Sequence, residues 1–241
     1  MAEQIVEFFT QHWYLLIVFA LMAASVYLML RLQVMLQQNM ARNIQTLLAD
    51  NPELCLERLN NNHRLKWLFR KPVITLWKLD CYLALGNDNE AGICMEALRS
   101  MKLEPQDKLE LYQREISFYA AIGDGERAKG ARNDLRNLLK KAGVEQEKKY
   151  ASIMDEADII IGVYVEHNTG LIKKLIGRAE HTKNDVMRGV IQYRIAKLSW
   201  FKHDEEMMRT YLNRAEKNLI GTWYEPIIRQ AKVDHSILET K

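Results

Sequence analysis

The sequence predicts an all-α protein: a single N-terminal transmembrane helix, then a solenoid of about five helical hairpins and a C-terminal capping helix. Residues 13 to 30 form an apolar run without a charged residue. Beyond this run, apolar side chains recur three or four residues apart, which is the period of an amphipathic helix. Short turns containing Gly, Asn or Asp interrupt the pattern at similar intervals, as in proteins built from repeated helix pairs.

The apolar run reads WYLLIVFALMAASVYLML. As a helix it is roughly 27 Å long, close to the roughly 30 Å hydrocarbon core of a bilayer. Its Leu, Ile, Val and Phe residues contribute roughly −3 to −5 kcal/mol to insertion, which offsets Ser25 and Tyr27. Trp13 and Tyr14 at one end and Arg31 at the other are typical of interfacial anchors. We therefore expect this run to span a lipid bilayer.

Two other interpretations fit part of this pattern. A cleaved signal peptide begins with basic residues and ends at small ones. This chain begins with two glutamates instead, and its small residues, Ala23 to Ser25, lie inside the run. A buried core helix is the second alternative, because eighteen uncharged residues lie at the lower limit of spanning length.

Flanking charge predicts the orientation of the span. No Lys or Arg precedes it, whereas many follow: Arg31, Arg42, Arg58, Arg64, Lys66, Arg70 and Lys71. Because basic flanks stay in the cytoplasm, we expect the N-terminus outside and the C-terminal domain in the cytoplasm. The three cysteines, Cys55, Cys81 and Cys94, form no CxxC pair. We expect them to be buried thiols of a reducing compartment and not a disulfide framework.

Residues that break helices are few, and they mark helix starts. No Gly or Pro lies between Thr10 and Asn51, so the N-terminal helix can continue past the span without a break. Each of the four prolines stands where a helix can begin, because the first helical turn tolerates a missing N–H. These prolines are Pro52, Pro72, Pro105 and Pro226. Asn51 is a predicted N-cap.

Helical spacing is clearest in residues 126–142. One stripe there contains Ala128, Ala131, Leu135, Leu138 and Ala142. Residues 158–165, DIIIGVYV, have strand propensity. Both flanks of this segment are helical and a lone strand would lack a pairing partner, so we expect a helix there too.

The turns repeat one plan. LGNDNEA at 85–91 aligns with IGDGERA at 122–128, and their first glycines, Gly86 and Gly123, are 37 residues apart. Each of these glycines follows a tyrosine by four residues and precedes an alanine by five. FKHDEEM at 201–207 repeats the plan without glycine. Self-similarity at such a period indicates an α-solenoid, in which each helix pair buries its apolar face against its neighbours.

These turns resemble those of the tetratricopeptide repeat family, in which a helix with an aromatic residue ends at glycine and a second helix opens on alanine after an acidic turn. The matching residues are Tyr82, Gly86, Glu90 and Ala91, then Tyr119, Gly123, Glu126 and Ala128. The resemblance covers roughly residues 32–220. At the place where the family has a small residue in its first helix, this chain has Leu79, Ile116 and Ile195.

The resemblance implies a groove, lined by the first helix of each unit, that binds peptides or other proteins. On the matching positions its lining would be Leu76, Asp80, Leu83, Gln113, Ser117, Ala120, Gln192, Ala196 and Ser199. This lining mixes polar and apolar side chains. It lacks the basic clamp that captures a terminal carboxylate in some relatives.

The predicted organisation is a transmembrane anchor, residues 1–31, followed by one solenoid domain, residues 32–241. We place helix pairs at about 32–65, 72–103, 107–143, 148–182 and 185–219. A capping helix at 222–239 would cover the exposed end of the stack, because the last repeat of a solenoid otherwise shows its core face to water.

Motifs for catalysis or for metal and cofactor binding are not apparent. The histidines are scattered, at His12, His63, His167, His181, His203 and His235, and no HExxH or CxxC spacing occurs. GDG at 123–125 lacks the strand and the Lys-Ser pair of a phosphate-binding loop. The acidic residues after His203 fit a helix N-terminus, which negative charge stabilises. The sequence therefore predicts no catalytic residue, no metal site and no cofactor.

One helix face carries a row of basic residues beside its apolar stripe. This basic face consists of Lys129, Arg132, Arg136 and Lys140. It could contact anionic lipid or an acidic partner segment, since each basic residue contributes roughly 1 kcal/mol at a charged membrane surface. The alternative is a solvated face that keeps a repeat protein soluble.

The function that follows is a single-pass membrane protein whose cytoplasmic solenoid acts as an interaction scaffold for protein or peptide partners, without catalysis. The net charge of +3 gives no indication of nucleic-acid binding. The same fold on the other side of the membrane would be an anchored assembly or envelope factor. An enzyme with an all-helical pocket is a third hypothesis, which a deep cavity with convergent polar groups and perturbed ionisable residues would favour.

Overall fold

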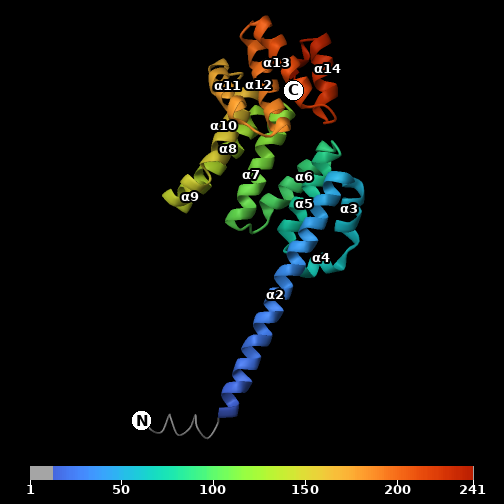
Figure 1. The fold of residues 1–241 in the computed structure, drawn as a ribbon, viewed down its shortest axis with the longest axis vertical. Coiled ribbons are helices and arrows are strands. Elements are labelled where there is room, and N and C mark those ends of the chain that lie inside the picture. Colours follow the sequence, from blue (N-terminus) through green and yellow to red (C-terminus); the bar gives the residue numbers. More distant parts are fainter. Residues whose placement is uncertain (1–12, 241) are drawn as a thin grey trace. The chain divides into compact units, whose positions relative to one another are not determined.

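The computed structural model describes residues 13 to 240, and every element among them is helical (Figure 1). The expectation of an all-α protein is confirmed for this part of the chain. The chain divides between Lys102 and Leu103 into two compact units, here named unit 1 and unit 2. The stacking of helix pairs into one solenoid stays a prediction.

Unit 1 begins with one long helix, α2 (Trp13–Asp50). The helices that follow are α3 (Pro52–Asn61), α4 (His63–Leu68), α5 (Lys71–Ala84) and α6 (Asp88–Ser100). The 38 residues of α2 run without a break, as the lack of Gly and Pro predicts. It ends where predicted, because the Asn51 side chain accepts a hydrogen bond from the Leu54 N–H and Pro52 opens α3.

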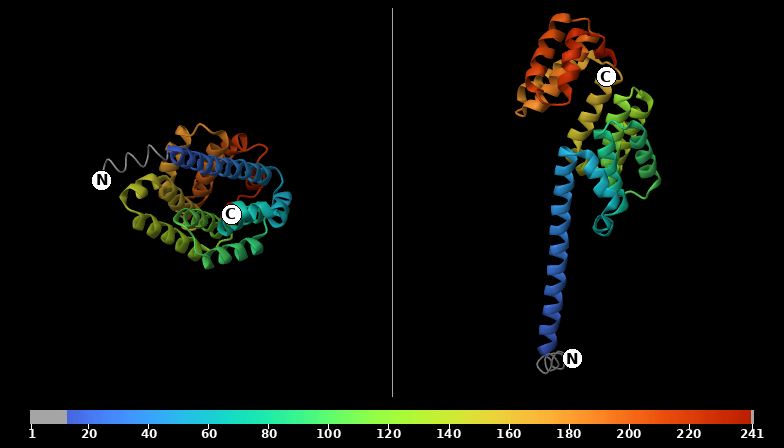
Figure 2. Two further views of the ribbon diagram at one scale, coloured as in Figure 1. Left: turned by 90° about the horizontal axis from the view of Figure 1, so that it is seen from below. Right: turned by 90° about the vertical axis from the view of Figure 1, so that its right-hand side faces the viewer.

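The two halves of α2 have different surroundings (Figures 1 and 2). Within residues 13–240, α2 is the helix long and apolar enough to cross a membrane, and its most apolar window has a mean hydropathy of 1.9 with no part buried. Its last turns are packed into unit 1 instead. Ile44, only 5% exposed, joins a core cluster with Cys55, Leu59 and Leu65, against which Met40 also packs. The same helix is therefore bare at one end and part of a core at the other.

The three cysteines are buried and free, as expected. The Cys55 thiol on α3 donates a hydrogen bond to the backbone carbonyl of Ile44 on α2 at 3.8 Å, and Cys81 lies on α5. Burial raises the pKa of both thiols above the usual range of a cysteine, and it does the same for Cys94. All three are consequently protonated packing residues in the folded chain.

Unit 2 continues the plan of helix pairs. Its elements are α7 (Pro105–Ala121), α8 (Gly125–Ala142), α9 (Val144–Lys149), α10 (Ala151–Tyr164), the 3₁₀ turn η1 (Thr169–Leu171), α11 (Ile172–His181), α12 (Asp185–Phe201), α13 (Glu205–Asn218), α14 (Tyr224–Val233) and α15 (Ile237–Thr240). Residues 158–164 are helical, as expected in spite of their strand propensity. The helices α7 and α8 pack on each other, as do α12 and α13.

The turns within three helix pairs share one geometry. Gly86 and Gly123 have φ of 66° and 80°, the left-handed region that glycine enters without strain. His203 takes the same place between α12 and α13 with a φ of 61°. In each turn the next residue donates its N–H to a carbonyl five residues earlier; Asp204, for example, donates to Ser199 at 2.9 Å. The pattern without glycine at 201–207 therefore forms the same turn at a conformational cost.

We expect His203→Gly to stabilise the chain by about 0.5–1 kcal/mol, because it removes a side chain from a left-handed backbone. The measurement is the thermal unfolding midpoint of the full chain in detergent solution. The neighbouring change Lys202→Gly is the matched control, because Lys202 has a φ of −81°. It should lower the midpoint, and an equal response of both variants would contradict the assignment of strain to His203.

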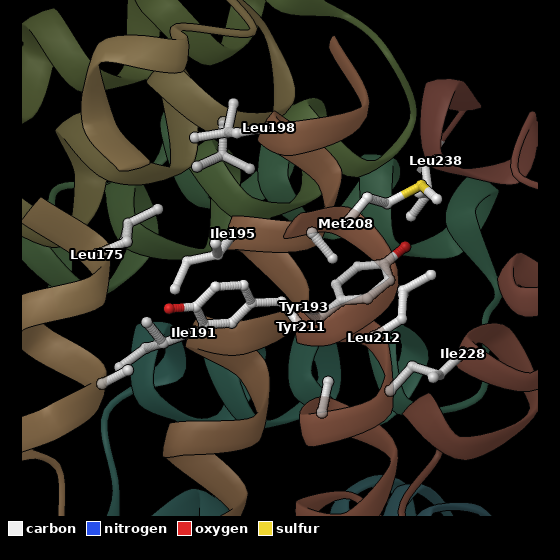
Figure 3. Packing of buried hydrophobic residues seen from close by; sticks show 14 of the residues in the cluster. Leu175, Ile191, Tyr193, Ile195, Leu198, Met208, Tyr211, Leu212, Ile228 and Leu238 are labelled. Carbon is white, nitrogen blue, oxygen red and sulfur yellow. The ribbon is translucent and has the colours of Figure 1, made fainter. Parts of the chain in front are cut away.

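The core of unit 2 is an apolar cluster built mainly by α10 to α15 (Figure 3). Leu198 on α12 and Met208 and Leu212 on α13 are fully buried in it. The α8 stripe differs from the prediction at two positions: Leu139 enters the core in place of Leu138, which is half-buried, and Ala142 is exposed. A spacing of four residues, from Leu135 to Leu139, keeps the stripe on the buried face.

The C-terminal segment forms two helices in place of the single capping helix expected at 222–239. The break is at Asp234, whose backbone is extended. Its carboxylate accepts hydrogen bonds from the Ser236 N–H at 3.0 Å and the Ser236 hydroxyl at 2.7 Å. Such a local turn satisfies the polar groups that a continuous helix would have used. The short α15 then packs on α12 and α14.

Candidate functional site

The residues predicted to line a partner groove divide between the two units. In unit 1, Leu76, Asp80 and Leu83 all lie on α5. Leu76 is only 2% exposed, whereas Asp80 and Leu83 are half-buried. A partner at this side of α5 would therefore contact mainly the partly exposed side chains of Asp80 and Leu83.

The other predicted groove residues lie on α7 and α12 of unit 2. On α7, Gln113 is half-buried, Ser117 is exposed and Ala120 is buried. On α12, Gln192, Ala196 and Ser199 are all buried. The side-chain carbonyl of Gln192 accepts a hydrogen bond from the side-chain amide of Asn218 at 2.8 Å. The Ser199 hydroxyl donates to the backbone carbonyl of Ile195 at 2.8 Å. Use of these residues for partner binding stays a prediction.

The basic face on α8 is engaged within unit 2. Arg132 and Arg136 each lie 3.3 Å from the carboxylate of Asp158 on α10. Lys129 lies 3.8 Å from Glu126, one turn earlier on the same helix. Lys140, the fourth member, is exposed near the end of α8. A partner acid would therefore compete with Asp158 for two of the four basic side chains.

The acidic residues of α10 pair with three neighbouring helices. Asp155 contacts Lys174 and Arg178 of α11. Glu156 contacts Arg178 as well, at 3.3 Å, and it accepts a hydrogen bond from Arg194 of α12 at 2.6 Å. Most of these pairs are partly exposed, and such ion pairs contribute at most about 1 kcal/mol each. Arg194 is the exception, because its side chain is only 11% exposed. Together the pairs link α8, α11 and α12 to α10.

A cavity of about 280 Å³ lies within unit 2 beside the C-terminal part of α12. Its lining residues are Ala120, Gly123, Gly125, Tyr164, Val165, His167, Lys197 and Glu239. They come from the turn between α7 and α8, the end of α10 with the segment after it, α12 and α15. Ala120 is the predicted groove residue that reaches this cavity.

Lys197 is the unusual side chain of the cavity. It is only 1% exposed, and its ammonium donates a hydrogen bond to the backbone carbonyl of Leu238 at 2.5 Å. The nitrogen also lies 5.6 Å from the centre of the Tyr164 ring and 5.8 Å from that of Phe201, within cation–π range. Burial lowers the pKa of Lys197 from 10.5 to about 8, although the nearby Glu239 carboxylate acts in the opposite direction.

The other polar groups of the cavity are held by defined contacts. His167 has a φ of 48° and stacks on Phe201 with ring centres 3.8 Å apart. Its Nδ1 lies 3.2 Å from the Val163 carbonyl, which can only accept, so Nδ1 carries the proton. Glu239 accepts a hydrogen bond from the Trp200 indole at 3.4 Å. An amine, an imidazole, a phenol and a carboxylate therefore border one small cavity.

This arrangement has a clear structural use. A helix end leaves backbone carbonyls without partners, and the Lys197 ammonium satisfies the Leu238 carbonyl of α15. Leu238 itself is fully buried, so the contact holds the C-terminal segment on α12. The hydrogen-bond partner of the Lys197 ammonium is therefore the protein's own backbone.

Sequence reasoning did not identify Lys197. The available signal was its position in the sequence. The lysine stands between Ala196 and Leu198 and four residues after Tyr193, which places it on the core side of its helix. The acids of α10 were missed too, because their partners are distant in sequence: Arg132 is 26 residues from Asp158, and Arg194 is 38 from Glu156.

Across the part of the chain that the structure describes, no three His, Cys, Asp or Glu side chains gather in a way that could hold a metal ion. His181 and His235 each place Nδ1 2.7 Å from a carbonyl one helical turn earlier, at Gly177 and Ala231. His12 lies outside the described residues.

Comparisons with family models, curated proteins and solved structures found no match to this chain.

Proposed function

We propose that this chain is a membrane-anchored interaction scaffold, in which α2 spans the bilayer and the helical units bind protein partners beside it. The observation that carries the proposal is the bare apolar half of α2. Its described side chains from Ile17 to Leu36 are all exposed, and they include Phe19, Leu21 and Met29 at more than 60% exposure. Apolar patches of this extent on a folded protein mark contacts with a membrane or a partner.

The rigid connection between α2 and unit 1 also supports the proposal of a scaffold. Because α2 continues into the core of unit 1 through Met40 and Ile44, no flexible tether separates the anchor from the folded part. Unit 1 therefore stays close to the bilayer surface. Such an arrangement limits the partners to proteins that reach that surface.

An exposed apolar patch in unit 2 is suited to binding a protein. We call it the end patch; its members are Val186, Met187, Ile220 and Trp223. The start of α12 and the end of α13 meet there, because a Cβ on Gly189 would lie 2.6 Å from Leu219 and Arg188 donates to Asn218 at 3.2 Å. Exposed Trp and Met side chains are enriched at the centres of protein interfaces.

The orientation of the span is part of the proposal. The basic residues that follow α2's apolar half favour the cytoplasm for units 1 and 2. The native thiols cannot report the side of the membrane by labelling, since all three are buried. Ser100, an exposed residue at the end of α6, offers a position for a reporter, Ser100→Cys. Labelling of this variant in intact cells by a reagent that does not cross membranes would support the extracytoplasmic alternative.

The test uses the full chain in lipid nanodiscs as bait. We expect saturable capture of a partner protein, and at least tenfold weaker capture by the double variant Met187→Ala/Trp223→Ala, because truncating a central interface residue costs about 1–2 kcal/mol or more. Val144→Ala is the matched control, since Val144 is as exposed as Trp223 but lies on α9. Turnover of a small molecule without a saturable protein partner would overturn the proposal.

A further inference from the structure

Unit 1 contains a strongly basic segment next to the anchor. Residues 58–79 include six Lys and Arg and no Asp or Glu. The short helix α4 lies in the middle of this segment, and Arg64, Lys66 and Lys71, on it and just after it, are exposed. A local excess of positive charge of this kind attracts phosphate groups.

The helix α4 has a buried face and a bare one. Leu65 is fully buried and Leu68 nearly so, and both fix the helix to unit 1. Trp67 points the other way and is 78% exposed. Tryptophan is enriched where a membrane meets water, because its ring is apolar and its N–H needs a polar partner.

A direct contact fixes the position of α4 along α2. The Gln37 side-chain amide donates a hydrogen bond to the backbone carbonyl of Leu68 at 2.8 Å. Gln37 directly follows the bare apolar residues of α2, which end at Leu36. Figures 1 and 2 show α4 at the end of unit 1 nearest the N-terminal half of α2.

The contact between Gln37 and Leu68 lies just outside the headgroup layer. Gln37 lies about 10 Å along the helix from Leu30, where the uncharged run ends, and directly beyond the last bare apolar residue. The headgroup region on each side of a bilayer is roughly 6 Å thick. With α2 in the membrane, α4 therefore lies about 4 Å beyond a headgroup layer of this thickness, within the roughly 8 Å over which charges attract each other at physiological ionic strength.

We propose that α4 is a second membrane contact, in which Trp67 enters the interfacial layer while Arg64, Lys66 and Lys71 bind the phosphates of anionic phospholipids. This inference rests on the proposed function, because it needs α2 in the bilayer. The anchor alone would leave unit 1 able to rotate about the axis of α2. The contact through α4 fixes which side of the unit faces the membrane.

The experiment places a spin label on the full chain at Trp67→Cys and measures its depth from collisions with oxygen and with a water-soluble nickel complex. The chain is reconstituted into vesicles of phosphatidylcholine alone and of phosphatidylcholine mixed with phosphatidylglycerol. The unsubstituted chain serves as the labelling blank, because its own thiols are buried. Leu21→Cys on the bare half of α2 and Ile93→Cys, exposed on α6, are the lipid and water references.

We expect the label at position 67 to report headgroup depth in the mixed vesicles and to move toward water without the anionic lipid. Each of Arg64→Glu, Lys66→Glu and Lys71→Glu should weaken docking by about fivefold or more. If the labelled Trp67→Cys chain does not fold, His63→Cys provides the depth measurement, because His63 is exposed at the start of α4 and is not one of the three phosphate-binding residues.

The outcomes separate this inference from the anchor. A label at 67 in water in both vesicles, with the Leu21→Cys label in lipid, would overturn the α4 contact and leave the anchor intact. Equal depth at 67 in both vesicles would overturn the assignment of anionic lipid. A Leu21→Cys label in water would overturn the proposed function itself.

Discussion

Replacing Leu21 and Val26 with arginine is expected to release the full chain from the membrane fraction. Both side chains are more than half exposed on the bare half of α2. Arginine at the centre of a span is less favourable than Leu or Val by about 3 kcal/mol, so the pair adds about 6 kcal/mol. This exceeds the roughly −3 to −5 kcal/mol that the apolar run contributes. The measurement is the distribution of the chain between membrane pellet and supernatant.

The matched control is Gln38→Arg/Asn39→Arg. These residues are also exposed on α2, but they lie beyond its apolar half. The control adds the same charge and should stay in the pellet. An unchanged pellet fraction for the Leu21→Arg/Val26→Arg variant would show that the bare half of α2 does not hold the chain in the bilayer.

Exchanging Lys197 for methionine is expected to remove a pH-dependent part of the chain's stability. The pKa of Lys197 is lowered to about 8 in the folded chain from an ordinary 10.5. Between about pH 8 and pH 10.5, Lys197 is therefore protonated in the unfolded chain and mostly deprotonated in the folded chain. The free energy of unfolding consequently rises with pH in this range. We expect a rise of about 1–3 kcal/mol in the wild type relative to Lys197→Met, complete above pH ~10.5.

The comparison with Lys197→Met is needed because other groups act in the opposite direction. Burial raises the pKa of Tyr193, Tyr224 and the three cysteines. The unfolded chain therefore loses these protons at lower pH than the folded chain does, and the free energy of unfolding falls as the pH rises through the same range. Taking the difference between the two proteins cancels these contributions. A difference that is constant from pH 7 to ~11 would contradict the lowered pKa.

Much of the local structure could be predicted because it depends on neighbours in the sequence. The unbroken α2 follows from the lack of Gly and Pro. The Asn51 cap is equally local, because the Asn51 side chain accepts a hydrogen bond from the N–H of Leu54, three residues later. The turns at Gly86 and Gly123 were found for the same reason. Their repetition also led to the turn at His203, where the backbone conformation is maintained without glycine.

The prediction failed where distant packing decides. On α8, Leu138 and Leu139 are equally apolar, and only the neighbouring helices determine that Leu139 enters the core.

The break at Asp234 was missed for a different reason. It had a local signal, an Asp two residues before a Ser, that the apolar spacing of 222–239 concealed.

The candidate site shows a different limit. Lys197 reaches the carbonyl of Leu238, 41 residues later, and a backbone carbonyl is present at every position. No residue type therefore marks the partner in the sequence. In the same way, Gln37 and Leu68 are 31 residues apart, and only the folded unit shows that the basic segment lies beside the end of the apolar run.

The unbroken course of α2 has a mechanical consequence. With α2 across the bilayer, as proposed, a change in bilayer thickness relative to the apolar length of this rigid helix is accommodated by tilting. Because the same helix ends inside the core of unit 1, the unit must lean with it. The chain would thus convert a change in membrane thickness into a change in the angle at which unit 1 faces the lipid surface.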